Sequence, residues 1–370
     1  MEILTQAFKW QAKGSHYHLV KDTKLKFYII ASLQGFKPAD PFFLESYCNT
    51  LCVKIKKIDK NKDVSANKNL KLLKEALREV SRDVYLENSK LKGFGHSEFS
   101  ITCAFILDGR LYCAHVGDNK LVLLRENITD QLTDDHNIFY EFEKKNISSE
   151  DFPYSNALTR SIGKFPELDV DSFYIQLKHA DTLVFISQTD KKLIDKLETM
   201  SSSSLSEFTR QIYEANHGKD GALMILNIDS SQEIPLEQNK EIEYIELLFK
   251  IKFFSDFNLT QLSRIYHQCE ELIFEKGELI HSQTENHLKG IFIITSGEVV
   301  KEMNTKKLIS FFRKDIFLIK GHDTRPSHLI QAFAQEKTKL LYLSRKRLEK
   351  LLIRYPWLGQ KFHTLIQRIL

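Results

Sequence analysis

Residues 112–136 read YCAHVGDNKLVLLRENITDQLTDDH, and this stretch decides the fold of the first half of the chain. Its two apolar runs, YCAHVG and KLVLLRE, are bounded by Gly, Asp and Asn, as β-strands are. The turn between them, Val-Gly-Asp-Asn at residues 116–119, places a glycine where a tight reversal suits one. The stretch therefore predicts two neighbouring strands with Asp118 in the turn that joins them.

Further strands and helices are predicted on both sides of this stretch. The strand-like runs are LKFYIIAS, SITCAFIL, DTLVFISQ and GALMILNI. Residues 69–87 repeat their apolar side chains with the spacing of an amphipathic helix, and residues 204–217 form a second helical stretch. Runs of strands packed with a few long helices are typical of a layered α+β domain.

The length of the chain predicts two domains. Its 370 residues exceed the roughly 250 to 300 residues at which a single core stops growing. Residues 229–243 are polar, contain a proline and lack hydrophobic periodicity, which is typical of a linker. This linker separates residues 1–228 from residues 244–370. In the second part, short strands punctuated by glycines lie between helical segments, which predicts a small β-roll with flanking helices.

The composition argues against several classes of protein. A hydrophobic fraction of 42% and a charged fraction of 28% are ordinary for a soluble globular protein, and a net charge of +4 gives no argument for nucleic-acid binding. The longest apolar runs have the length of strands, and the N-terminus has no long apolar core of the signal-peptide kind. Five scattered cysteines form no disulfide or metal-binding pattern. We therefore expect a cytoplasmic protein without a membrane segment.

Residues 14–228 resemble, in colinear order, the metal-dependent type 2C protein Ser/Thr phosphatases. The resemblance rests on the opening stretch, on ALTRSIG at 157–163, on LDVDSFYIQLKHADTLVFIS at 168–187 and on GKDGALMILNI at 218–228. It implies an αββα sandwich, in which two antiparallel sheets pack face to face with helices outside. It also implies a site for two Mg²⁺ or Mn²⁺ ions, held mostly by Asp side chains at one end of the sandwich.

Most of the carboxylates that this resemblance requires are replaced. Ser32 and Leu33 occupy the positions of the family's Asp-Gly pair, and Gln188 occupies that of the Asp in a later Ser-Asp-Gly. The early Glu-Asp motif is replaced within GSHYHLV, residues 14–20. Asp220 remains of the core ligand set, and Asp118 matches a position linked in some members to an additional, weaker metal.

The number of remaining carboxylates determines the function that we expect of this first domain. Two divalent ions held close together repel strongly, and only anionic ligands nearby offset that repulsion. The sequence therefore predicts that the first domain binds no metal cofactor and has no catalytic residues. A domain of this kind is a pseudophosphatase, and we expect it to act as a signalling scaffold. The alternative is a divergent protein Ser/Thr phosphatase that uses Mg²⁺ or Mn²⁺ and is regulated by its second domain.

Two histidines leave a further alternative open. His16 and His18 are two residues apart, so on a strand their side chains share a face. With Asp220 they could hold Zn²⁺ or another softer ion. The simpler interpretation is that they border a vacated pocket. The acidic sequence Asp134-Asp135-His136 is interpreted as a structural turn.

Residues 244–370 resemble cyclic-nucleotide-binding domains, through LLFKIKFFSDFNLTQLSRI, EKGELIHSQTENHLKGIFIITSGEV and LLYLSRKRLEKLLIRYPWL. That family binds the ribose through a Gly-Glu pair and the cyclic phosphate through an Arg. Alignment places Ile316 and Phe317 in the Gly-Glu positions and Pro326 on the Arg, with Arg325 one place early. The resemblance thus implies a degenerate pocket, filled by its own apolar side chains, that binds neither cAMP nor cGMP.

Together these observations predict a two-domain signalling protein whose partners are other proteins, with no nucleic acid and no membrane. Binding of another small ligand by the β-roll is a third possible function.

Overall fold

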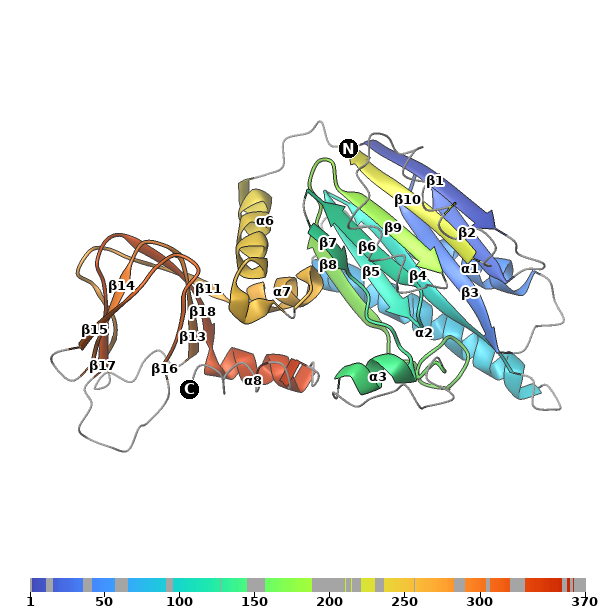
Figure 1. Cartoon of the computed structure of the whole chain (residues 1–370). Coiled ribbons are helices and arrows are strands. Elements are labelled where there is room, and N and C mark those ends of the chain that lie inside the picture. Colours follow the sequence, from blue (N-terminus) through green and yellow to red (C-terminus); the bar gives the residue numbers. More distant parts are fainter. Residues whose placement is uncertain are drawn as a thin grey trace. The chain divides into compact units, whose positions relative to one another are not determined.

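The structure of the chain is a computed structural model, in which the chain divides into two compact units, Met1–Pro235 and Leu236–Leu370 (Figure 1). Each unit is described by itself. The structure describes residues 2–10, 16–35, 42–56, 66–90, 96–126, 128–144, 157–187, 210, 214, 221–229, 236–255, 257–282, 290–303, 307–319, 330–354, 358–359 and 362.

The first unit is a sandwich of two five-stranded antiparallel sheets, as the resemblance to the type 2C phosphatases implies. The first sheet contains, in spatial order, β1 (Glu2–Trp10), β10 (Gly221–Asp229), β9 (Thr182–Ser187), β6 (Lys120–Arg125) and β7 (Ile128–Gln131). The second sheet contains β2 (Tyr17–Asp22), β3 (Phe27–Gly35), β4 (Ser97–Leu107), β5 (Arg110–Val116) and β8 (Asp171–Gln176). The two strands of the opening stretch, β5 and β6, therefore belong to different sheets, and the Asp118 turn crosses between them.

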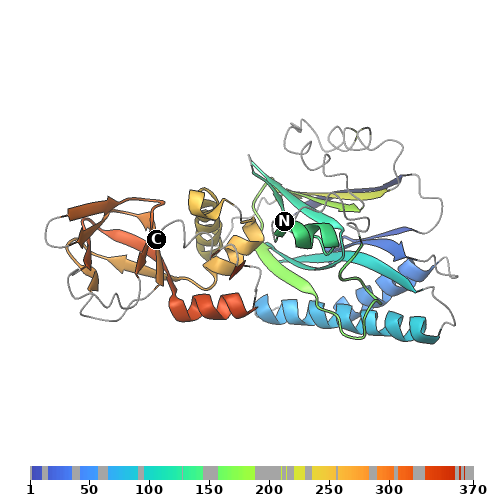
Figure 2. The same ribbon diagram turned by 60° about the horizontal axis from the view of Figure 1, so that its bottom comes forward.

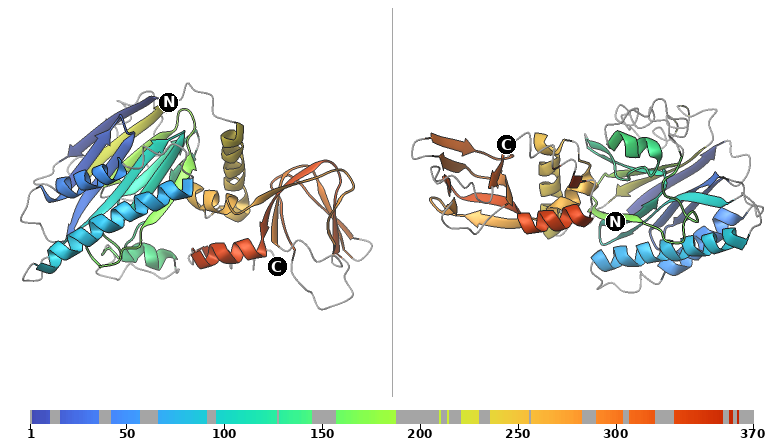
Figure 3. Two further views of the ribbon diagram at one scale, coloured as in Figure 1. Left: turned by 180° about the vertical axis from the view of Figure 1, so that it is seen from behind. Right: turned by 90° about the horizontal axis from the view of Figure 1, so that it is seen from below.

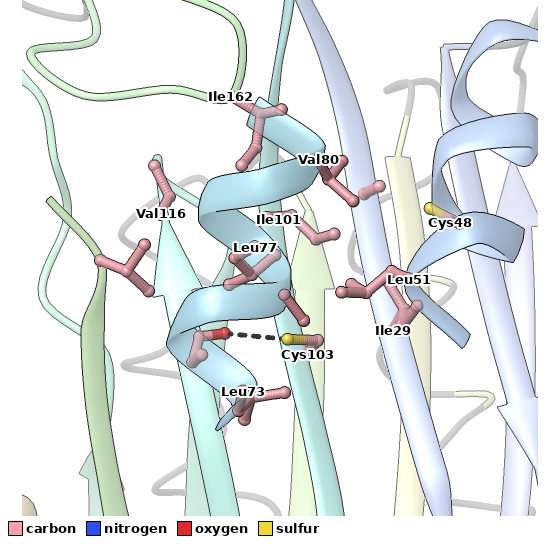
Figure 4. Close-up of a cluster of buried hydrophobic side chains, with 14 of the residues drawn as sticks. Ile29, Cys48, Leu51, Leu73, Leu77, Val80, Ile101, Cys103, Val116 and Ile162 are labelled. Atoms are coloured by element: carbon pink, nitrogen blue, oxygen red, sulfur yellow. Dashed lines mark hydrogen bonds between the residues drawn. The ribbon is translucent and has the colours of Figure 1, made fainter. Parts of the chain in front are cut away.

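Two antiparallel helices, α1 (Phe43–Ile55) and α2 (Ala66–Lys90), cover the outer face of the second sheet (Figures 2 and 3). Helix α2 presents Leu73, Leu77 and Val80 to the sheet, and all three are buried (Figure 4). Burying side chains of this size contributes roughly 1.5 to 3 kcal/mol each. The predicted helix at 69–87 is thus present and holds the sheet from behind.

The residues of β3 alternate between the two faces of the second sheet. Ile29, Ala31 and Leu33 belong to the core that α1 and α2 cover. Because side chains alternate along a strand, Tyr28 and Ser32 face the first sheet. This alternation places Ser32 inside the sandwich and its neighbour Leu33 outside it.

The remaining described helix of this unit is α3 (Ile138–Lys144). The second helical layer predicted at 204–217 lies outside the described residues, apart from Arg210 and Glu214. The sandwich fold is thus mixed α+β, and the part that can be described shows one helical layer beside two sheets.

At one end of the first sheet, a buried ion pair joins β6 to the start of β9. The guanidinium of Arg125 donates to both carboxylate oxygens of Asp181 at 2.7 and 2.8 Å, and to the carbonyl of Gln176 at 2.8 Å. Both charged side chains are almost fully buried. The hydrogen bonds within this pair offset the cost of burying both charges, and they tie β6 to the start of β9.

The second unit contains two four-stranded antiparallel sheets (Figures 1 and 2). One contains β11 (Glu270–Phe274), β18 (Thr338–Ser344), β13 (Gly290–Ser296) and β16 (Ile316–Ile319). The other contains β12 (Leu279–Ser282), β17 (Ile330–Ala334), β14 (Val299–Met303) and β15 (Lys307–Phe311).

Four helical segments accompany these sheets: α6 (Leu236–Phe249), the 3₁₀ segment η1 (Lys252–Phe254), α7 (Leu259–Tyr266) and α8 (Arg345–Arg354). Asn258 caps α7 reciprocally with Gln261. Helix α6 begins at Leu236, inside the stretch 229–243 that lacks periodicity and was predicted to be a linker. Burial of Ile242 and Ile245 on α6 offsets its weak sequence pattern. Among the described residues, no helix is long and apolar enough to cross a membrane.

Candidate functional site: the polar end of the sandwich

Hydrogen bonds and strand register bring one end of each sheet together. The hydroxyl of Ser32, near the end of β3, donates to Asn119 Oδ1 at 2.8 Å across the sandwich. Asn119 directly precedes β6, where Lys120 pairs with Ile186 near the end of β9. Ser187, the last residue of β9, exchanges two hydrogen bonds with Ala222 near the start of β10. We call this region the polar end.

Uncharged polar groups fill the interior of the polar end. Ser32 is buried, and the amide of Asn119 also donates to the carbonyl of Ile30 at 3.3 Å. Thr102, on β4, places its hydroxyl 3.1 Å from the carbonyl of Asn119. The hydroxyl that replaces the expected carboxylate at position 32 thus binds an amide of the opposite sheet. Sequence reasoning missed Asn119 and Thr102, whose contribution depends on the pairing between strands.

Asp118 is held in place by its turn. Ser100 Oγ donates to Asp118 Oδ1 at 2.7 Å and accepts the backbone N–H of Asp118 at 3.2 Å. Gln34 Nε2 lies 3.5 Å from the same carboxylate oxygen. Gly117 has φ +102°, and a Cβ on it would lie 2.1 Å from Ser100 Oγ. The turn therefore requires glycine, and the close approach that it permits fixes the carboxylate.

Two neighbouring histidines, His115 and His136, support this turn with their rings tilted against each other. Their ring centroids are 4.8 Å apart, and both side chains are fully buried. His115 places Nε2 3.0 Å from the carbonyl of Asp134 and Nδ1 2.8 Å from the hydroxyl of Thr102. Burial, reinforced by the neighbouring His136, lowers the pKa of His115 well below its usual range. His115 is therefore a neutral structural group.

The carboxylates of Asp134 and Asp135 form hydrogen bonds and an ion pair with residues nearby, as expected for a structural turn. Asp135 forms an ion pair with Lys120, and Gln131 donates to its other oxygen at 3.1 Å. Tyr140 donates its hydroxyl to Asp134 at 2.5 Å. Burial raises the pKa of Asp135, against the favourable effect of Lys120. The contacts of these two carboxylates therefore stabilise the loop after β7.

The structure separates the other predicted site residues. His18 pairs with Ala31, whose side chain lies on the helix-covered face, so His18 points away from the face of Ser32. Leu33 packs on the same helix-covered core. His16 lies before β2 and is linked to β3 through its carbonyl, which accepts from Leu33 N at 2.8 Å. Gln188 and Asp220 lie outside the described residues, so the set of His16, His18 and Asp220 stays a prediction.

The fit of a metal to the polar end can be tested on its described donors. These donors are one carboxylate, from Asp118, together with hydroxyl and amide oxygens from Ser32, Ser100 and Asn119. Oxygen donors suit a hard cation such as Mg²⁺ or Mn²⁺, but a single anion does not offset the repulsion of two ions. Within the described ranges, no three His, Cys, Asp or Glu side chains gather around a metal position. The described donors thus offer a divalent ion one carboxylate, and they fall short of what two ions need.

The predicted nucleotide pocket of the second unit is described in part. Phe317 is buried and stacks on Phe292, with ring centroids 4.8 Å apart, and Phe292 stacks in turn on Tyr342 at 4.7 Å. Ile316 is half-buried beside it, and Arg325 and Pro326 lie outside the described residues. Phe317 thus belongs to the hydrophobic core of this unit.

Comparisons with known proteins agree with the fold of the first unit. Residues 42–194 match the family model described as Protein phosphatase 2C. The serine/threonine phosphatase stp of Listeria welshimeri serovar 6b is 30% identical over 146 residues, which are 36% of this chain and 57% of that protein. Protein phosphatase PhpP of Streptococcus pneumoniae serotype 2 is 28% identical over 141 residues, which are 31% of this chain and 57% of that protein. The chain spans little more than half the length of these relatives.

Solved structures share the fold. The serine/threonine phosphatase of S. agalactiae superposes with a TM-score of 0.52 at 18% identity, covering 62% of this chain and all of that one. Stp1 from Staphylococcus aureus gives 0.51 at 15% identity, covering 62% of this chain and 96% of that one. At these identities the likeness shows the fold alone.

Residues 42–194 of the first unit thus match the Protein phosphatase 2C model, and the unit shares its fold with solved phosphatases of this kind. The prediction that the chain has no metal cofactor is wrong, because this family works with Mg²⁺ or Mn²⁺ and the relatives are named as phosphatases. The same relatives favour the divergent phosphatase over the inactive scaffold.

Proposed function

We propose that this chain is a divergent, metal-dependent protein Ser/Thr phosphatase whose reaction takes place at the polar end. The family match of residues 42–194 and the named relatives support the reaction class. The observation that carries the proposal is the Asp118 turn, which presents one carboxylate where both sheets end.

Asp118 is the described residue best placed to hold a cation. Its Oδ1 accepts from Ser100 and lies near Gln34, whereas its Oδ2 has no hydrogen-bond partner among the described residues. Asp220, directly before β10 in sequence, is the second carboxylate that we assign to the same ion. When bound, a divalent ion supplies a Lewis acid and lowers the pKa of a bound water.

The protein's own groups position that ion and the substrate. Ser100 holds the Asp118 carboxylate in one orientation, which removes the entropy cost of ordering it during binding. Ser32 and Asn119 tie the two sheets together next to it without adding charge. With fewer carboxylates than the family pattern, this site repels a phosphate dianion less than an Asp-rich site does before any metal binds.

We assign the second unit a regulatory role through protein contacts. In this proposal it does not bind cAMP or cGMP, and the burial of Phe317 in its core supports that assignment. The partners would be phosphorylated signalling proteins, which the first unit dephosphorylates.

Hydrolysis of a phosphothreonine peptide and of an aryl phosphate, with Mn²⁺ or with EDTA, tests the proposal. We expect turnover that needs Mn²⁺ and is lost in Asp220→Ala. The matched control is Asp229→Ala, at the far end of the same strand and more than half exposed, which should keep full activity. A folded protein without Mn²⁺-dependent or Mg²⁺-dependent turnover would contradict the proposal and favour the signalling scaffold instead.

A further inference from the structure

His136 lies where three segments of the first unit meet. Its ring Nδ1 accepts the backbone N–H of Gly117 at 3.0 Å, and its own backbone N–H donates to the carbonyl of Gly117 at 2.8 Å. Its carbonyl accepts from the N–H of Thr159 at 2.8 Å. One fully buried residue therefore holds the Asp118 turn and the loop at 157–163 at the same time.

The hydrogen bonds of the ring define its tautomer. Because Nδ1 accepts from a backbone amide, it carries no proton, and in the neutral ring the proton is on Nε2. Nε2 then donates to Asp171 Oδ2 at 3.1 Å. Asp171, at the start of β8, thus stabilises the same tautomer as Gly117 does and orients the ring from its other side.

Asp171 is itself held by a cation. Arg160 Nη1 donates to Asp171 Oδ1 at 3.1 Å, and it also lies 3.4 Å from a carboxylate oxygen of Asp169. Asp171 is partly buried, with 30% of its side chain exposed, whereas the Asp169 side chain is 74% exposed. The two carboxylates therefore share one arginine, but in the structure only Asp171 also contacts His136.

We infer that His136, oriented by Asp171 and Arg160, is a positioning residue that fixes the turn carrying Asp118. The chain of contacts runs from Arg160 to Asp171, to His136, to Gly117, and so to the residue next to it. Without the Asp171 carboxylate, Nε2–H loses its acceptor, and only the bond from Gly117 still favours this tautomer and ring orientation; the form protonated on Nδ1, which cannot accept from Gly117, becomes easier to reach. The turn then loses one of its anchors while Ser100 remains. This inference rests on the proposed function for its catalytic meaning.

The test compares Asp171→Ala with Asp169→Ala in the full chain. Both variants remove a carboxylate from Arg160, and only the first removes the partner of His136. Asp171→Asn is the conservative variant, because its amide oxygen can still accept from Nε2. Circular dichroism shows whether each variant is folded. If Asp171→Ala does not fold, Asp171→Asn replaces it in the comparison with Asp169→Ala.

Two measurements report on the order of the Asp118 turn. Hydrogen exchange of the peptide that spans residues 116–119 reports its opening, and we expect Asp171→Ala to speed that exchange about tenfold. The Mn²⁺ concentration for half-maximal turnover should rise about tenfold in Asp171→Ala, with kcat changed much less. Asp169→Ala should match the wild type in both, and Asp171→Asn should fall between.

A folded Asp171→Ala, or Asp171→Asn in its place, with unchanged exchange at 116–119 would overturn the inference. Equal effects of Asp171→Ala and Asp169→Ala would also overturn it, because they would reduce Asp171 to a partner of Arg160. Exchange is measured without substrate or metal. An inactive wild type would therefore count against the proposed phosphatase function and still leave the positioning role decided by exchange.

Discussion

The interiors of the two units differ in the side chains that fill them. Inside the polar end of the first unit, Ser32, Thr102 and Asn119 bind one another, and Asp118 lies at the margin. Inside the second unit, Phe292 and Phe317 stack in a continuous apolar core. Uncharged polar side chains leave oxygen donors available in the interior of the first unit, whereas stacked aromatic rings fill the interior of the second.

The largest expected effect concerns the aromatic interior. Phe317→Ala removes a buried ring that stacks on Phe292, and such a deletion costs about 3 to 5 kcal/mol in free energy of unfolding. Phe312→Ala is the matched control, because Phe312 is more than half exposed on the adjoining turn. Calorimetry or chemical denaturation measures the difference. Equal stability of the two variants would contradict an interior closed by Phe317.

A smaller effect is expected at the Asp118 turn. Gly117→Ala places a Cβ 2.1 Å from Ser100 Oγ at a positive φ, and we expect a loss of about 2 to 3 kcal/mol in stability. Gly277→Ala is the control, because its φ of +83° is also positive but no atom lies within 4 Å of the added Cβ. Both variants place alanine at a positive φ, and only Gly117→Ala adds a steric clash. The difference between their denaturant midpoints therefore measures the clash. If Gly117→Ala cost no more than Gly277→Ala, the tight packing of the turn would be refuted.

The buried histidine predicts a pH dependence of the polar interior. The unfolded chain binds a proton at His115 with a pKa of about 6.5, and the folded chain resists this proton because burial lowers its pKa. The unfolded state thus binds more protons below that pH, so stability is present above about pH 6.5 and is lost as the pH falls. Between pH 7 and 5.5 the expected loss is about 1 kcal/mol.

Urea denaturation at the two pH values measures this loss. His115→Gln should reduce it, whereas His179→Gln, at an exposed position, should leave it unchanged. A loss that is the same in the wild type and in His115→Gln would assign the pH dependence to other groups.

The smallest expected effect is that of metal removal on stability. One described carboxylate binds a cation weakly, and ligand stabilisation grows only with the logarithm of concentration over Kd. Adding EDTA to protein in millimolar Mn²⁺ should therefore lower the Tm by no more than roughly two degrees. A larger drop in differential scanning fluorimetry would indicate a structural metal.

The sequence predicted a layered α+β domain because its strands are apolar and bounded by turn residues, and because Leu73, Leu77 and Val80 repeat with helical spacing. The two-sheet sandwich came from the resemblance to the type 2C phosphatases. It did not predict the contacts of the polar end. Ser32 and Asn119 are 87 positions apart, and their hydrogen bond depends on how two sheets face each other. The spacing of His16 and His18 predicted a shared strand face. Only the pairing of His18 with Ala31 shows that this face is turned away from Ser32.

Helix α6 was missed for a related reason. Its start at Leu236 follows Pro235 in a polar stretch, and local propensity there is weak. Tertiary burial of Ile242 and Leu248 supplies the stabilisation that the sequence pattern does not show.

The most direct test of the account is a crystal structure of the full chain soaked in Mn²⁺, with anomalous scattering recorded at the manganese edge. The account predicts a manganese peak at the polar end, within coordination distance of the Asp118 carboxylate, and no such peak in Asp118→Asn. Density in which the polar end holds no manganese, at a Mn²⁺ concentration that saturates any turnover, would contradict the claim that this end is the metal-dependent site.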